Sequence, residues 1–339
     1  MIDIGFYMKS HGTFDYESIR NREPVVYNIE TTNACNMRCT MCPRTTMMTR
    51  PIVTMGFELF EKVVSQLKPH TPELWAKWEA WVLDTYGIPP TEMSENHFFL
   101  YIIPKVIQLH GYGEPLLDKN IGKFVKLLSD KGFPSYFSCN PANIDVGKTI
   151  EMFEKGLSYI KYSIESVNDE THKEIRGNAS NFTDAYRKIL RILEIKKERN
   201  LQTVIVITML DLNRKEQGKE YFQLKEMFDG LDVYIYFKSQ DTQWLNKDYH
   251  GTNSIHWSEP CRHPWMSMTI KSNGEAAMCM EDFNNAIVLG DAKTESLYDI
   301  WNGEKYDKLR KDHIRLTPNL QCTERCDMIL AGDSIEFQR

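Results

Sequence analysis

The sequence predicts an α/β fold, a partial (β/α)6 barrel followed by a small metal-binding domain. Short runs rich in β-branched and aromatic residues alternate with helical patterns across residues 23–254, which is typical of βα units with a parallel sheet. Six such units are too few to close an eight-stranded barrel, so we expect an open one with its chemistry at the carboxyl ends of the strands. The alternation stops in residues 255–339, and residues 1–22 form an N-terminal extension.

Each strand is predicted where a short apolar, β-prone run ends at turn or polar residues. These runs are 25–30, 105–110, 136–139, 159–164, 204–209 and 233–237. The connecting helices are predicted where apolar residues recur every three or four positions, as do Phe57, Phe60 and Val64. The clearest helical stretches are 57–67, 121–129, 181–198 and 215–228.

One long segment, residues 69–104, interrupts this alternation between the first helix and the second strand. It is rich in aromatic residues, and Trp75, Trp78 and Trp81 fall on one broad helical face. Connections between βα units are usually short, so an insertion of this length is often functional or an interaction surface. We expect a helix that packs on the flank of the barrel; a substrate lid or a dimer contact would also fit the pattern.

The pattern of the C-terminal region predicts a hairpin and a helix rather than a further βα unit. Residues 266–270 and 275–280 are β-prone and flank a turn in which Gly274 supplies the positive φ. A helical pattern follows over 296–312. We therefore predict a small domain over residues 255–339.

Composition excludes several classes of partner. The formal charge of −6 and the pI near 5.9 argue against nucleic acid, because proteins that bind its phosphates are usually basic. The longest apolar runs, such as 204–210, are far shorter than the roughly 20 residues that a membrane helix needs. The first residues show no secretory signal, so we expect a cytoplasmic protein whose cysteines are reduced.

Three cysteines directly after the first strand indicate a reaction centre. Cys35, Cys39 and Cys42 supply one ligand too few for a cubane four-iron cluster, so one iron would be open to another molecule. A structural zinc site would need a fourth ligand, and none lies nearby in the sequence. A disulfide is disfavoured in a reducing compartment.

A second set of cysteines lies downstream and could close a metal site. Its members are Cys261, Cys279, Cys322 and Cys326. Four thiolates suit either a structural zinc ion or a fully ligated iron-sulfur cluster. The presence of the first motif favours a second cluster over zinc.

These motifs resemble those of the radical S-adenosylmethionine (SAM) superfamily over most of the chain. The Cys35-x3-Cys39-x2-Cys42 loop is similar to the loop whose cluster binds SAM there, and Gly111-Tyr112-Gly113-Glu114-Pro115 resembles the Gly-Gly-Glu motif that meets the SAM ammonium group. The resemblance implies a 5'-deoxyadenosyl radical that abstracts hydrogen from the substrate. It also implies that the following residues contact SAM: Tyr112, Gly113, Glu114, Asn140, Ser163, Glu165 and Arg176.

The C-terminal region resembles the SPASM/twitch class of auxiliary-cluster domains. The similarity lies in Gly274-x4-Cys279-Met-Glu-Asp-Phe-Asn and in Leu297-Tyr-Asp-Ile-Trp-Asn. Four cysteines match the shorter, twitch-type form, which implies two [4Fe–4S] clusters in the chain. Within this class, the chain is similar to dehydrogenases that oxidise a secondary alcohol of an aminocyclitol.

The resemblance implies oxidation of a secondary alcohol in a small polar substrate, such as a sugar or an aminocyclitol, with the auxiliary cluster as electron acceptor. Candidate substrate or base residues are His110, Lys238 and Asp241, and a flavodoxin- or ferredoxin-type protein is the expected electron donor. Cys139 is the one cysteine outside both sets, and its thiol could donate hydrogen in an epimerase instead. A peptide-modifying enzyme and a two-cluster electron carrier are two further interpretations of the same motifs.

Overall fold

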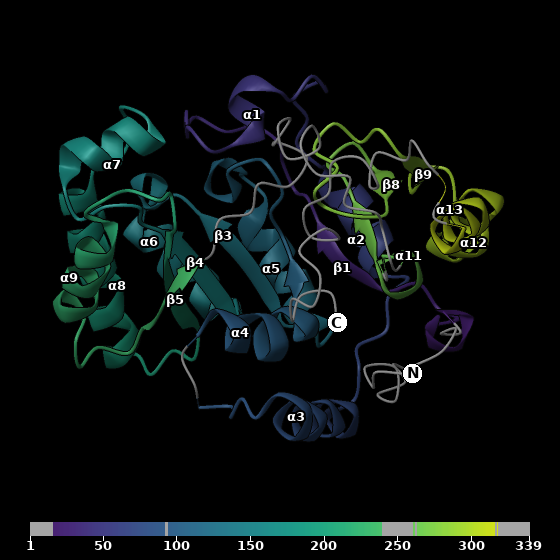
Figure 1. Ribbon diagram of the computed structural model, residues 1–339, viewed down its shortest axis with the longest axis horizontal. Coiled ribbons are helices and arrows are strands. Elements are labelled where there is room, and N and C mark those ends of the chain that lie inside the picture. The colour runs from purple at the N-terminus through teal and green to yellow at the C-terminus, as the bar shows by residue number, and fades with distance from the viewer. Residues whose placement is uncertain (1–15, 92–93, 239–259, 262, 316, 318–339) are drawn as a thin grey trace.

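The computed structural model describes residues 16–91, 94–238, 260–261, 263–315 and 317. In this part of the chain a nine-stranded sheet has the order β6-β5-β4-β3-β2-β1-β7-β8-β9, with helices packed along it (Figure 1). None of the described helices is long and apolar enough to cross a membrane.

The first six strands are parallel and follow one another in chain order across the sheet. They are β1 Val26–Ile29, β2 Ile107–Gln108, β3 Ser135–Cys139, β4 Tyr159–Ser163, β5 Val204–Leu210 and β6 Tyr234–Lys238. This arrangement confirms the predicted partial barrel. Because all six run the same way, their carboxyl ends meet at one edge, where the loops after them can form a common site.

The C-terminal hairpin extends the same sheet instead of forming a separate layer. Strand β7 (Met268–Ile270) pairs in parallel with β1, and β8 (Glu275–Ala277) and β9 (Val288–Asp291) follow in antiparallel order. The turn between β7 and β8 contains Gly274 at φ 89°, as predicted. Strand β1 therefore has a barrel strand, β2, on one side and a C-terminal strand, β7, on the other.

Helices cover the outer face of the barrel sheet because each has one apolar side. They are α2 Phe57–Val64, α5 Ile121–Asp130, α6 Val146–Glu154, α8 Phe182–Glu198 and α9 Gln217–Met227. Phe60 of α2 and Phe124 of α5 are fully buried and stack with their ring centres 4.2 Å apart. Two further helices, α1 (Pro43–Thr46) and α7 (Asp169–Arg176), lie at the carboxyl edge of the sheet, at the top of Figure 1.

The helix predicted over 296–312 is two helices, α12 (Leu297–Asn302) and α13 (Glu304–Ile314), which a short α11 (His263–Met266) precedes in the chain. The break falls at Gly303, whose ψ of 168° is extended. Trp301 is fully buried in α12, and its indole nitrogen donates to the Asn21 carbonyl oxygen at 2.7 Å. The periodicity predicts helix correctly on both sides of Gly303, but it does not show the break that this glycine introduces.

The insertion forms a helix, α3 (Pro72–Tyr86), and a second segment that fills the barrel. Thr71 caps the start of helix α3, with its hydroxyl accepting from Leu74 N, and Gly87 caps its end. The second segment comprises α4 (Glu95–His97) and a π-helical turn over Phe98–Ile102. In Figure 1, α3 lies at the bottom of the view, on the side of the sheet opposite α1.

Phe98 is the centre of this filling. Its side chain is fully buried, and its ring packs against Tyr136 of β3 and Tyr236 of β6 at 5.5 and 5.2 Å between ring centres. Residues two apart on a strand share a face, so these tyrosines point to the same side as Ser138 and Lys238. The insertion therefore closes the amino end of the barrel interior, a position that does not fit a lid over the carboxyl edge.

Candidate active site

The cysteine loop leaves β1 and packs on the last turn of α7. The backbone nitrogens of Arg38 and Thr40 donate to the carbonyl oxygens of Arg176 and Ile175 at 3.2 and 2.9 Å. Cys39 is buried, whereas Cys35 and Cys42 are partly exposed. These backbone hydrogen bonds hold the loop against α7.

Among the described residues, no three His, Cys, Asp or Glu side chains are gathered closely enough to hold a metal ion. Burial raises the pKa of the Cys35 thiol to about 11, so a bound cation is needed to keep it as a thiolate.

The Gly111–Glu114 loop after β2 is pressed against the cysteine loop. A Cβ on Gly113 would lie 2.0 Å from the Thr32 carbonyl oxygen, closer than any side chain can approach. The next backbone nitrogen, that of Glu114, donates to the Ala34 carbonyl oxygen at 2.7 Å. Gly113 is therefore required by packing, and the two loops take up one fixed arrangement.

Glu114 presents a buried carboxylate at the end of this loop. It accepts hydrogen bonds from the backbone nitrogens of Leu116 and Asn140 at 3.1 and 2.7 Å. Burial outweighs these bonds and raises its pKa to about 7. The side-chain nitrogen of Asn140 is buried and has no hydrogen-bond partner among the described residues. A ligand with a cationic group and an acceptor atom would satisfy both side chains.

Arg176 links the cysteine loop to β4. Its guanidinium donates to the carboxylate of Glu165 and to the Cys39 sulfur, the latter at 3.6 Å. Glu165 also accepts from the Leu210 backbone nitrogen at 2.7 Å. Ser163 lies nearby, with its hydroxyl 3.4 Å from that of Ser138. The strand ends β3, β4 and β5 are thereby tied together around the loop.

A cavity of about 310 Å³ opens at the carboxyl edge of the sheet. Its wall brings together the predicted residues Cys35, Cys39, Cys42, His110, Tyr112, Gly113, Glu114, Cys139, Asn140, Ser163, Glu165, Arg176 and Lys238. The predicted Asp241, Cys322 and Cys326 lie outside the described residues. Cys261 and Cys279 are buried and are not part of the wall, although Met280, Glu281 and Phe283 are.

Four polar residues of this wall were not predicted from the sequence: Ser138, Lys161, Thr208 and Glu281. Strand alternation could have identified Lys161, which is two residues before Ser163 on β4. Its ammonium nitrogen lies 5.2 Å from the centre of the Phe98 ring, above the aromatic filling of the barrel. Glu281 accepts from the Tyr112 hydroxyl at 2.7 Å, which joins the C-terminal region to the Gly111–Glu114 loop.

Burial lowers the pKa of His110 and raises that of Cys139, so both side chains are uncharged near pH 7. Burial, with a smaller effect of the Lys161 charge, lowers the pKa of His110 to about 3, so its imidazole is neutral and only weakly basic near pH 7. Burial raises the pKa of Cys139 well above its ordinary value, which keeps its sulfur as a thiol. That thiol is 4% exposed and donates to the Lys161 carbonyl oxygen at 3.7 Å.

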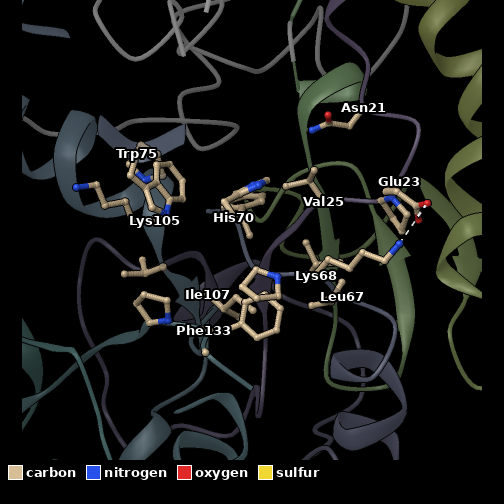
Figure 2. A pocket seen from close by; sticks show the side chains of 18 of the residues that line it. Asn21, Glu23, Val25, Leu67, Lys68, His70, Trp75, Lys105, Ile107 and Phe133 are labelled. Atoms are coloured by element: carbon tan, nitrogen blue, oxygen red, sulfur yellow. Dashed lines mark ion pairs between the residues drawn. The ribbon is translucent and has the colours of Figure 1, made fainter. Parts of the chain in front are cut away.

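A larger cavity of about 600 Å³ lies at the other end of the barrel, between α3 and the amino ends of β1 to β3. Figure 2 shows Trp75 and Lys105 beside it, His70 near its middle, and the Lys68–Glu23 ion pair toward one side. None of its lining residues is a cysteine or belongs to the predicted site. The smaller cavity is therefore the candidate active site.

The comparison with protein families assigns two domains. Residues 92–221 match the radical SAM superfamily, and residues 261–327 match the iron-sulfur cluster-binding SPASM domain. The first match begins after the cysteine loop, and the second spans all four downstream cysteines. With the partial barrel and the cysteine loop on its first strand, these matches define the class. The chain is a radical SAM enzyme with a SPASM domain, and its cofactors are SAM and [4Fe–4S] clusters.

Solved structures show the same fold at low sequence identity. BtrN in complex with AdoMet and 2-DOIA is 15% identical, with a TM-score of 0.52 over 94% of this chain and 96% of that chain. SuiB of Streptococcus suis bound to S-adenosylmethionine is 13% identical, with a TM-score of 0.55 over 91% and 72%. The protein anSMEcpe with bound AdoMet is 15% identical, with a TM-score of 0.52 over 88% and 84%. No curated protein sequence matches significantly.

The substitution Gly113→Ala tests the contact between the two loops. We expect it to weaken folding by about 1–3 kcal/mol, as overpacking does, and to lower the iron bound per chain because the cysteine loop must move. Urea unfolding and iron analysis measure the two effects. Gly218→Ala is the matched control, since a Cβ there meets nothing within 4 Å. Equal behaviour of the two variants would contradict the packing argument.

Proposed function

We propose that the chain oxidises a secondary alcohol of a small polar substrate, such as a sugar or an aminocyclitol. The observation that carries this proposal is the composition of the 310 Å³ cavity, whose wall combines the cysteine loop, the Gly111–Glu114 loop and the segment after Cys279. When bound, SAM and its cluster would supply a 5'-deoxyadenosyl radical that abstracts hydrogen. The residues of the chain bind, orient and exclude water around that chemistry.

The wall near the cysteine loop suits SAM. Glu114 offers a carboxylate to its ammonium group, and the unsatisfied amide of Asn140 offers a hydrogen-bond donor beside it. Arg176 can bind a carboxylate in a bidentate fashion, although in this structure it is paired with Glu165. Cys35, Cys39 and Cys42 would hold the cluster, and Ser163 and Tyr112 would complete the pocket.

The opposite part of the wall suits a polar substrate. Lys161 and Lys238 come from β4 and β6, and both ammonium groups lie over aromatic rings of the insertion, at 5.2 Å from Phe98 and 5.8 Å from Phe99. The low pKa of His110 makes it a poor base and favours a role as a neutral hydrogen-bonding group. Glu281 is a carboxylate of the cavity wall two residues after Cys279, and we propose that it accepts the hydroxyl proton.

Oxidation needs an acceptor for the second electron. We propose an auxiliary [4Fe–4S] cluster held by Cys261, Cys279, Cys322 and Cys326, the set that the SPASM match spans. A fully ligated cluster suits this role because it has no open position for substrate. BtrN, a butirosin radical SAM dehydrogenase with the same fold, supports the assignment as an analogy. A flavodoxin- or ferredoxin-type donor would supply the first electron.

Two different reactions also have some support. Cys139 lies in the cavity wall as a thiol, the form that can donate a hydrogen atom, which favours epimerisation. A peptide substrate has support from the structure of SuiB bound to its precursor peptide SuiA, which has a TM-score of 0.54 and 13% identity to this chain. The cavity volume of about 310 Å³ favours a small substrate over a peptide.

Glu114→Gln tests the SAM pocket. Because the pKa of Glu114 is about 7, we expect SAM affinity in the wild type to fall as the pH drops below 7, by up to about tenfold per pH unit. The variant should bind SAM about tenfold or more weakly at high pH and should lose this pH dependence. Anaerobic calorimetry on the reconstituted protein measures both effects. Glu151→Gln on the exposed side of α6 is the control, and a pH-dependent Glu114→Gln would contradict the assignment.

Cys139→Ala separates oxidation from epimerisation. We expect the variant, incubated with sugars and aminocyclitols in deuterated buffer, to form the same ketone product as the wild type. The buried thiol then serves only as packing. The measurement is mass spectrometry of the product. Deuterium at carbon in the wild-type product that disappears in Cys139→Ala would overturn the proposed oxidation and establish the epimerase.

A further inference from the structure

Glu30, the first residue after β1, forms a buried ion pair with Arg50. Its side chain is fully buried, and its two oxygens accept from the two terminal nitrogens of Arg50 at 2.8 and 2.5 Å. Neither residue lines the candidate active site. The pair therefore needs an explanation other than contact with SAM or substrate.

Arg50 also reaches across to the segment that follows Cys279. Its remaining guanidinium nitrogen, Nε, donates to the Phe283 carbonyl oxygen at 2.6 Å. The next residue, Asn284, accepts from the Thr49 backbone nitrogen at 2.7 Å and donates to the Met47 carbonyl oxygen at 3.1 Å. Residues 47–50 and 283–284 are thus joined by three hydrogen bonds. The chain leaving the cysteine loop and the chain leaving Cys279 lie side by side.

Glu30 holds the β7–β8 turn from the other side. One of its oxygens accepts from both the backbone nitrogen and the hydroxyl of Ser272, at 3.3 and 2.9 Å. The neighbouring Lys271 is 1% exposed and donates to the Met280 carbonyl oxygen at 3.0 Å. Both ends of the strand and loop that carry Cys279 are therefore fixed to one carboxylate and its partners.

The energetics of this cluster indicate a role in placement. Burial alone would raise the pKa of Glu30, but the Arg50 hydrogen bonds and the Lys271 charge lower it, so the pair stays ionised. A buried ion pair often contributes no more stability than apolar residues of similar size, because both charges lose their hydration. The ion pair instead defines a geometry, because the planar guanidinium group of Arg50 hydrogen-bonds to Glu30 and to Phe283 at the same time.

We propose that Glu30 and Arg50 are positioning residues that set the place of the auxiliary cluster relative to the SAM-binding cluster. Without them, the segment after Cys279 and its Glu281 would no longer be held against the cavity. This inference rests on the proposed function, in particular on a second cluster at Cys279.

The test compares Glu30→Gln/Arg50→Met with the wild type in the reconstituted full-length protein. Replacing both residues avoids the buried unpaired charge that either single replacement by an uncharged residue would leave. The readout is the spin–spin interaction between the two reduced clusters, measured by pulsed electron paramagnetic resonance, because it falls steeply with distance. Lys62→Met is the matched control, since Lys62 also donates from the barrel to a C-terminal carbonyl, that of Lys293 at 2.8 Å, but at an exposed place.

We expect the double variant to keep about eight irons per chain and to cleave SAM with a chemical reductant as the wild type does, but to lose or weaken the spin–spin interaction. Lys62→Met should retain the interaction. If the double variant binds its full iron and its spin–spin interaction is unchanged, Glu30 and Arg50 are not positioning residues, but the proposed function stands. A wild type with only about four irons would overturn the proposed function, and this inference with it. Glu30→Asp keeps a carboxylate and Glu30→Gln does not. A spin–spin interaction that is retained in Glu30→Asp and lost in Glu30→Gln would further support the ion pair as the feature that positions the clusters.

Discussion

Parallel pairing of β1 on both of its sides is the constraint on which the site depends. Asn28 of β1 is in register with Gln108 of β2, and Ile29 is in register with Ile270 of β7. Three carboxyl ends therefore lie next to one another, and they lead into the cysteine loop, the Gly111–Glu114 loop and the turn before Cys279. The side-chain contacts of the cavity then refine a neighbourhood that backbone hydrogen bonds have already created.

An open barrel needs its interior closed from below, and the insertion does this. Phe98 and its tyrosine neighbours fill the amino end of the interior with buried aromatic side chains, beneath Lys161 in the cavity wall. Lys161 lies over these rings, where an aromatic face stabilises its ammonium group without neutralising it. The segment that looked like a lid or a flank helix in the sequence thus shapes the cavity from the opposite side.

Features that depend on a short stretch of residues could be predicted from the sequence. The six barrel strands follow from β-prone runs, and the cysteine spacing and Glu114 follow from motifs whose residue types the chemistry requires. Features that depend on distant segments could not be predicted. Nothing local shows that β7 joins β1 or that Arg50 meets Phe283, because each contact joins residues far apart in the chain. Glu281 was visible beside Cys279 but had no role until the fold placed it in the cavity wall.

We propose that one chain holds two cluster sites, one in the cavity wall at Cys35, Cys39 and Cys42, and one at Cys279, just before residues 280–283 that also line this wall. The most direct measurement is iron and acid-labile sulfide per chain after anaerobic reconstitution, in the wild type and in a variant with Cys35, Cys39 and Cys42 replaced by Ala. We predict about eight irons in the wild type and about four in the variant, with 5'-deoxyadenosine formed from SAM only by the wild type. About four irons with one bound zinc in the wild type would contradict this proposal.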